Sequence, residues 1–235
     1  MKILKGLMVM VISIMISSIS LYADSFTLFP ERDTYIDEST PDENYEDSLF
    51  LGVGDFKDNI KYSFLQFDLS SLASYSANDV LSATLKLYSV GSSPGSGGDD
   101  LEVWSADLVD TSWDDDFNFN WDSWMSYGRW ENKYSSTYVN AGYNGWVEWD
   151  VTNLVKDWLE DINLSGYILG IRNDEDGLNE LAEVMFSSEA KGWGDVAPRL
   201  ELTVVPEPLS VILSLFGFLP LFSIRFFRRK FFKSE

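Results

Sequence analysis

The sequence contains no cysteine and no histidine in 235 residues. Without cysteine the chain forms no disulfide, so its stability has to come from a packed core, with a bound metal as the one further aid. Histidine is the commonest general base and the commonest transition-metal ligand. Its absence excludes Ser-His-Asp and Cys-His catalytic sites and histidine-zinc sites. Carboxylates remain as the candidates for such chemistry.

Basic side chains are also scarce, with 17 Lys and Arg against 38 Asp and Glu. Only Glu207 and Glu235 among the acids, and seven of the bases, lie outside residues 24–205, which leaves 36 acids, 10 bases and a formal charge of −26 in that segment. Such a surface repels phosphate backbones, so we expect no nucleic-acid partner. It attracts cations, although solubility alone accounts for most of the carboxylates.

Long apolar runs occur only at the two ends of the chain. Lys2 and Lys5 precede an apolar run over residues 7–19, and the small Ala23 follows, which predicts a signal peptide over residues 1–23 with a buried helix as the alternative. A second run, residues 209–224, is followed by a basic flank and predicts a transmembrane helix whose flank stays cytoplasmic. Export would place the domain of residues 24–205 outside the cytoplasm.

The clearest strand pattern runs from Tyr62 to Ser70. Leu65 and Phe67 alternate with Phe64 and Gln66, and both faces carry bulk, which predicts a central strand that is covered on both sides. Similar short alternating runs recur between polar turns, and Thr152 is placed to cap one short helix. We therefore expect an all-β fold: an antiparallel β-sandwich of jelly-roll type with one short helix, flanked by the signal helix and the transmembrane helix.

Residues 107–145 are the least regular part and are rich in aromatic and acidic side chains. A long stretch without periodicity is often functional, and an indole face matches the C–H face of a sugar ring. Core filling is the alternative for each tryptophan. In the strand over residues 146–151, Trp146 shares a face with Glu148, which suits a sugar site with a hydrogen-bond acceptor. The predicted carbohydrate-binding residues are Trp113, Trp121, Trp124, Trp146 and Glu148.

Two carboxylate patterns allow other chemistry. Asp114 and Asp116 are candidate ligands for Ca²⁺, which takes oxygen ligands, although a solvated charge run is the simpler interpretation. Glu148 and Asp150 lie at positions i and i+2 on one strand face, as a glycosidase pair could. Such pairs also arise by chance in a chain this acidic.

The tail resembles a PEP-CTERM sorting signal. The resemblance rests on Pro206, Glu207 and Pro208, the apolar run from Leu209, and the basic cluster of residues 228–230. It implies an exosortase-type membrane protease as a partner, a Gram-negative bacterium as the source, and an association with exopolysaccharide. A plain single-span anchor is the alternative.

The body of the chain is similar to the DNRLRE domain family, which includes carbohydrate-binding modules. The resemblance rests on short motifs at residues 33–36, 44–45, 64–70, 83–88, 150–152, 158, 186–189 and 197–200. It implies a β jelly roll that binds polysaccharide and is not catalytic. Residues 107–145 depart from the family pattern, so the identity of the ligand does not follow from the resemblance.

These observations predict an exported, non-catalytic polysaccharide-binding domain that is sorted to the cell envelope, the cell surface or an extracellular matrix. Because the domain carries so much negative charge, we expect its glycan to be neutral, or acidic and bridged by Ca²⁺. The alternatives are a matrix protein that binds other proteins, a polysaccharide-degrading enzyme and an ice-surface binder.

Overall fold

Short alternating runs of the sequence form the strands of two antiparallel sheets. The computed structural model describes residues 23–55, 59–92, 98–114, 116–140, 142–160, 167–173, 184–187 and 195–205. The first sheet contains β1 (Asp24–Leu28), β5 (Val80–Ser92), β8 (Gly145–Asp150), β10 (Val184–Ser187) and β11 (Arg199–Val204). The second sheet contains β2 (Pro30–Asp37), β3 (Phe50–Asp55), β4 (Ile60–Phe67), β6 (Asp99–Leu108), β7 (Gly128–Val139) and β9 (Tyr167–Asn173).

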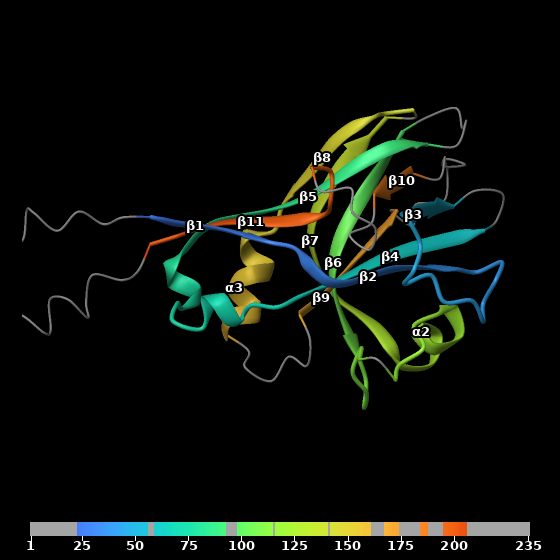
Figure 1. Ribbon diagram of the computed structural model, residues 1–235, viewed down its shortest axis with the longest axis horizontal. Helices are drawn as coiled ribbons and strands as arrows, with labels where there is room; N and C mark the ends of the chain where they lie inside the picture. The colour runs from blue at the N-terminus through green and yellow to red at the C-terminus, as the bar shows by residue number, and fades with distance from the viewer. Residues whose placement is uncertain are drawn as a thin grey trace, which may run out of the picture. The chain divides into compact units, whose positions relative to one another are not determined.

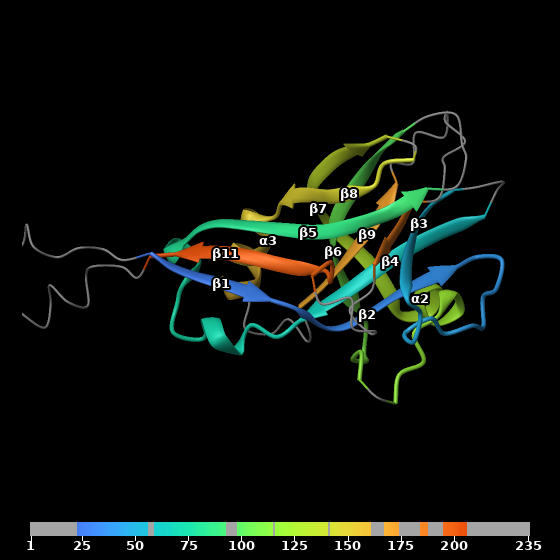
Figure 2. The same ribbon diagram turned by 45° about the horizontal axis from the view of Figure 1, so that its top comes forward.

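Strand β5 is the centre of the first sheet. It pairs with β8 along one edge and with β11 and β10 in succession along the other, while β1 adds to the outside of β11 (Figures 1 and 2). The second sheet has the order β2-β4-β9-β6-β7. Strand β3 pairs with β4 and also with β10, so it links the two sheets. All these pairs are antiparallel, and the predicted β-sandwich agrees with this arrangement.

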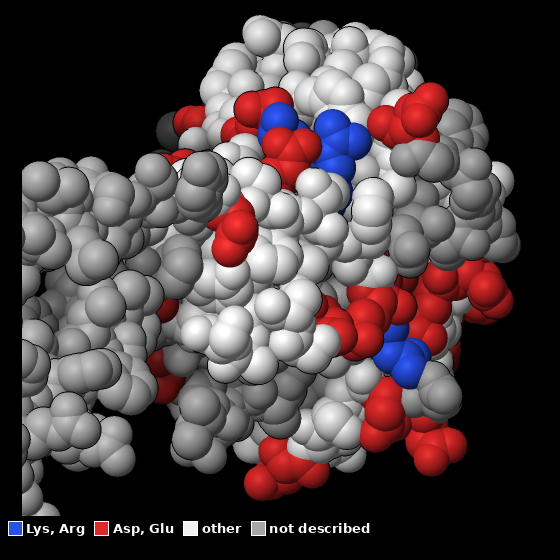
Figure 3. Space-filling model, turned by 60° about the vertical axis from the view of Figure 1, so that its left-hand side comes forward, with Lys and Arg blue, Asp and Glu red and all other residues white. Residues whose placement is uncertain are grey.

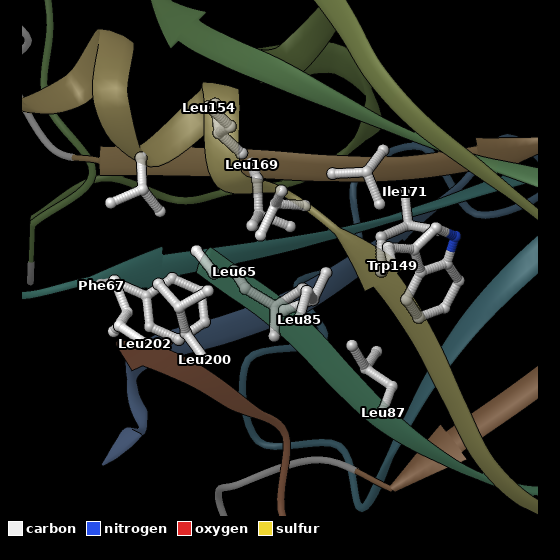
Figure 4. Close-up of a cluster of buried hydrophobic side chains, with 14 of the residues drawn as sticks. Leu65, Phe67, Leu85, Leu87, Trp149, Leu154, Leu169, Ile171, Leu200 and Leu202 are labelled. Carbon is white, nitrogen blue, oxygen red and sulfur yellow. The ribbon is translucent and has the colours of Figure 1, made fainter. Parts of the chain in front are cut away.

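The main core lies between the sheets. Leu65 and Phe67 of β4 belong to one buried cluster with Leu85 of β5 and Trp149 of β8, and all four are at most 1% exposed (Figure 4). The buried indole of Trp149 donates a hydrogen bond from Nε1 to the carbonyl oxygen of Leu101, at 2.9 Å. The prediction that residues 62–70 form a central strand is therefore confirmed for the face of β4 that points into the main core.

The outer face of β4 is covered as well, by a second apolar cluster. Phe64 is fully buried, and its ring centroid lies 4.9 Å from that of Phe119 and 4.4 Å from that of Trp124. The segment that carries these partners crosses the outer face of the second sheet. Its cluster consists of Ile36, Phe64, Ala106, Leu108, Trp113, Phe119, Trp124 and Ile168.

The segment 107–145 is more regular than its sequence predicts. It contains the helix α2 (Trp121–Tyr127) and the long strand β7. Asn120 caps α2, because its side-chain oxygen accepts the amide N–H of Ser123 at 2.8 Å. Alternation failed to reveal β7 because its pairing with β6 shifts register twice, which breaks the period of two.

The predicted short helix is α3 (Thr152–Glu160), which buries Leu154, Val155 and Trp158. The carboxylate of Asp150 fixes Thr152, the first residue of α3, by accepting hydrogen bonds from its N–H and its hydroxyl at 3.0 and 2.6 Å. Because α2 is also present, the expectation of one helix is corrected to two within the described residues, besides 3₁₀ turns at Ser70–Leu72 and Ala77–Asp79.

Residues Ser25–Val204 form one compact unit. The predicted signal helix, the transmembrane helix of residues 209–224 and the sorting residues Pro206, Glu207 and Pro208 lie outside the described residues. Within the described part of the chain, no helix is long and apolar enough to cross a membrane.

Candidate functional site

A groove of about 240 Å³ lies between β7 and β8, which are edge strands of the two different sheets. The hydroxyl of Thr137 on β7 donates to the carbonyl oxygen of Glu148 on β8 at 2.8 Å and so holds the strands together. The buried side chains of Val139 and Val147 form the apolar part of the groove. The lining residues are Thr137, Tyr138, Val139, Asn140, Tyr143, Trp146, Val147 and Glu148.

Three aromatic side chains line this groove. Tyr138 is 57% exposed, Tyr143 is 39% exposed, and Trp146 is half-buried. The Tyr143 hydroxyl donates to the carbonyl oxygen of Trp146 at 2.9 Å, which fixes the turn between the strands. Gly145 has a φ of +151°, and a Cβ there would lie 2.9 Å from the Tyr143 oxygen, so this turn requires glycine.

Trp146 also contacts its own sheet. The guanidinium carbon of Arg199 lies 4.1 Å from the centroid of the indole, and the ring of Tyr88 approaches it edge-on at 5.4 Å. Arg199 therefore covers one indole face. Trp146 is also one of the residues that line the groove.

Charges beside Trp146 are balanced. Lys86 lies 3.0 Å from a carboxylate oxygen of Glu148 and 3.0 Å from one of Glu201, and Arg199 binds the second oxygen of Glu201 at 2.9 Å. Hydrogen bonds to Glu148 and then to Glu201 raise the pKa of Lys86. Burial alone would raise the pKa of Glu201, but Lys86 and Arg199 outweigh it and lower that pKa. We call Lys86, Glu148, Arg199 and Glu201 the charge cluster.

Charge is balanced within this cluster, although the domain as a whole is acidic. Figure 3 shows one face of the molecule, on which Asp and Glu predominate and the few visible Lys and Arg lie next to acidic side chains. The charge cluster contains two bases and two acids, so its formal charge is zero.

The structure brings two of the predicted sugar-binding residues together, Trp146 and Glu148. It places Trp113 and Trp124 in the core, at 2% and 3% exposure, so their faces are not open to a ligand. The reason is that residues 113–124 cover the outer face of β4, where these rings exclude water. Trp121 is half-buried and stacks on Tyr62 at 5.8 Å, away from the groove lining.

Tyr138, Tyr143, Thr137 and Asn140 are groove residues that the sequence pattern did not reveal. They belong to the stretch in which no periodicity is visible. A usable signal was present: Gly142 and Gly145 mark a turn between two aromatic-containing strands. That turn would have placed Tyr138 beside Trp146.

The proposed calcium ligands have local partners. One oxygen of Asp114 accepts the Ser112 hydroxyl at 2.7 Å and the other accepts the Asp116 amide at 3.1 Å, and these bonds, the hydroxyl first, lower the pKa of Asp114. Within the described residues, no group of three or more acidic side chains is placed to hold a metal. Calcium binding by Asp114 and Asp116 stays a prediction.

Glu148 and Asp150 do not share one role. The hydroxyl and amide of Thr152 lower the pKa of Asp150, whereas a glycosidase acid needs a raised pKa. Its bonds place Asp150 at the junction of β8 and α3, while Glu148 pairs with Lys86.

Comparison with known proteins gives one assignment. The model of carbohydrate-binding module family 96 matches residues 24–203, and this family supports a carbohydrate-binding function. No curated protein matches the chain. Because the match covers nearly all of both sheets and well over half of the sequence, the chain belongs to carbohydrate-binding module family 96.

Proposed function

We propose that this chain is an exported, non-catalytic polysaccharide-binding domain and that the groove between β7 and β8 is its binding site. One observation carries the proposal: the groove combines three aromatic rings with polar side chains from the facing edges of two sheets. Ligand sites are typically concave and largely apolar, with a few placed polar groups.

The chemistry of the groove suits a sugar ring. The indole of Trp146 offers an apolar surface to ring C–H groups, and Tyr138 and Tyr143 add surface at little cost in side-chain entropy. Glu148 accepts hydrogen bonds, Asn140 both donates and accepts them, and the Thr137 hydroxyl, which donates to the Glu148 carbonyl oxygen, can still accept one. A volume of about 240 Å³ is below the roughly 300–1,000 Å³ of sites that enclose drug-sized ligands, so the groove holds a short stretch of a longer chain.

The glycan is neutral, or acidic and bridged by Ca²⁺. A domain segment with a formal charge of −26 repels an acidic polymer unless a cation lies between them. Asp114 and Asp116 remain the candidate calcium ligands, and they do not line the groove. Ca²⁺-dependent binding of an acidic glycan would therefore use a different surface from the binding of a neutral glycan.

The cellular setting follows from the sequence of the two ends. The signal peptide, the Pro206-Glu207-Pro208 motif and the apolar run that follows support export, processing by an exosortase-type protease and a role with exopolysaccharide or extracellular matrix at the cell envelope. The membrane is a partner of the tail before processing. The DNRLRE resemblance supports the same assignment and a jelly-roll topology.

Binding to a glycan array, followed by isothermal titration calorimetry on the hits with and without a calcium chelator, tests the proposal. We expect Trp146→Ala and Tyr138→Ala each to weaken binding about tenfold, because a lost aromatic contact costs about 1–1.5 kcal/mol. Tyr127→Ala is the matched control, since Tyr127 is a similarly exposed tyrosine (48%) on α2 that does not line the groove.

Full binding by both groove variants would place the site elsewhere on the domain. A release of reducing sugar from a bound polysaccharide, measured in the same samples, would contradict the non-catalytic assignment.

A further inference from the structure

The polar surface beside the groove continues across the first sheet. On the outer face of this sheet, Lys86 of β5 stands opposite Glu148 of β8 on one side and Arg199 of β11 on the other. Tyr88 stands opposite Trp146, one pair farther along the same strands. The side chains of the charge cluster thus form a band that crosses three strands and starts at the edge of the groove.

Arg199 keeps unused hydrogen-bonding capacity in this band. Its Nε donates to Glu201 at 2.9 Å and its guanidinium stacks on Trp146. Among the described residues, its two terminal nitrogens make no hydrogen bond, so four N–H groups of a planar fork remain available. Within the described part of the chain, Glu148 likewise uses one of its two carboxylate oxygens, toward Lys86.

Donors and acceptors of this kind match adjacent hydroxyls of a sugar. A planar fork can donate to two neighbouring oxygens at once, and a carboxylate oxygen can accept from a third hydroxyl. Arg199 and Glu148 both adjoin Trp146, so a sugar held against the indole would have its next residue within reach of them.

We propose that Arg199 and Glu148, with Lys86 and Glu201 holding them in place, form a second subsite that binds the hydroxyls of the next residue of a neutral polysaccharide. This inference rests on the proposed function of the groove. Neutral sugars are favoured because Glu201 already binds the guanidinium and the domain around the cluster carries net negative charge, and both repel an anionic group. The ligand is then an internal stretch of chain that runs from the groove toward β11.

The competing interpretation is that the charge cluster is only a surface ion-pair lattice. Exposed ion pairs contribute little to stability, and Glu148 and Glu201 are 52% and 38% exposed, although Lys86 and Arg199 are largely buried at 20% and 24% exposure. The two interpretations differ in one measurable property, which is how affinity depends on the length of the ligand.

Calorimetric titration with cello-, manno- and xylo-oligosaccharides of two to six residues measures this dependence. For the wild-type protein we expect affinity to rise about tenfold from the shortest oligosaccharide that binds to the hexasaccharide. Arg199→Lys keeps the charge and loses the planar fork, so it should lose most of this gain in affinity with ligand length.

Arg129→Lys is the matched control. Arg129 is an exposed arginine paired with Asp107 and Glu131 on the second sheet, away from the groove, and the variant should keep the full gain with length.

Three results would overturn the subsite: no gain with length in the wild type, a full gain in Arg199→Lys, or binding of none of the neutral series. None of them overturns the proposed function by itself, because loss of array binding in Trp146→Ala tests the groove separately.

Discussion

Gly170 of β9 lies directly against the indole of Trp130, and a Cβ at this position would be 2.3 Å from Cζ3 of that ring and 3.0 Å from Cε1 of Phe64. Trp130 therefore extends from β7 across the outer face of the second sheet as far as β4. The absence of a side chain at residue 170 is what allows the second apolar cluster to close over the sheet.

Gly170→Ala should accordingly lower the free energy of unfolding by about 1–3 kcal/mol, which is the usual cost of overpacking a core. Chemical denaturation measures this loss. In a Trp130→Phe background the cost should be smaller, because the smaller ring leaves room for the methyl group. Equal costs in both backgrounds would contradict the contact with Trp130 as the cause.

Leu65→Asp and Phe67→Asp should each prevent folding. Both side chains are at most 1% exposed, and burying an unpaired carboxylate costs several kcal/mol against a typical total stability of about 5–15 kcal/mol. Glu148→Gln, on an exposed position of β8, should fold normally. Circular dichroism and thermal melts distinguish these outcomes, and a native melt for either core variant would refute the central position of β4.

Stability should fall at high pH because of Tyr134. Burial first, and then the hydrogen bond to Asp157 on α3 at 2.5 Å, raise the pKa of this tyrosine to about 12. The folded state thus favours the neutral hydroxyl, so its contribution is complete below the ordinary pKa of about 10 and is lost as the pH rises toward 12.

Tyr134→Phe removes this ionisation. Denaturation midpoints between pH 9 and about 11.5 should decline less steeply for the variant than for the parent, although the variant lacks the bond to Asp157 and starts from a lower stability. Parallel pH profiles would mean that Tyr134 ionises as readily in the folded chain as in the unfolded one.

The mature protein should lack both ends of the chain. Cleavage after Ala23 and processing near Pro206 would leave roughly the two-sheet domain, whose mass in material from the native host is directly measurable by mass spectrometry. Recovery of a chain that retains residues 209–235 would favour a plain membrane anchor over a sorting signal.

Local pattern predicted the fold class. Alternation alone predicted that β4 is a central strand covered on both faces, because neighbouring side chains of a strand point to opposite sides whatever the strand pairs with. Leu65, Leu85 and Trp149 are buried as that rule requires. The same rule placed Trp146 and Glu148 together on one strand face, and both line the groove. The lack of histidine and cysteine also excluded whole classes of site on composition alone.

Tertiary structure alone decided which tryptophans are buried and where the groove lies. Trp113 and Trp124 resemble Trp146 in sequence, but the segment that carries them folds over Phe64 and hides them, which depends on contacts distant in the chain. The groove exists because β7 and β8 end the two different sheets side by side, and the register shifts in β7 conceal that strand from any local pattern. Arg199 meets Trp146 only because β5 brings β8 and β11, which are far apart in the sequence, to opposite edges of one strand.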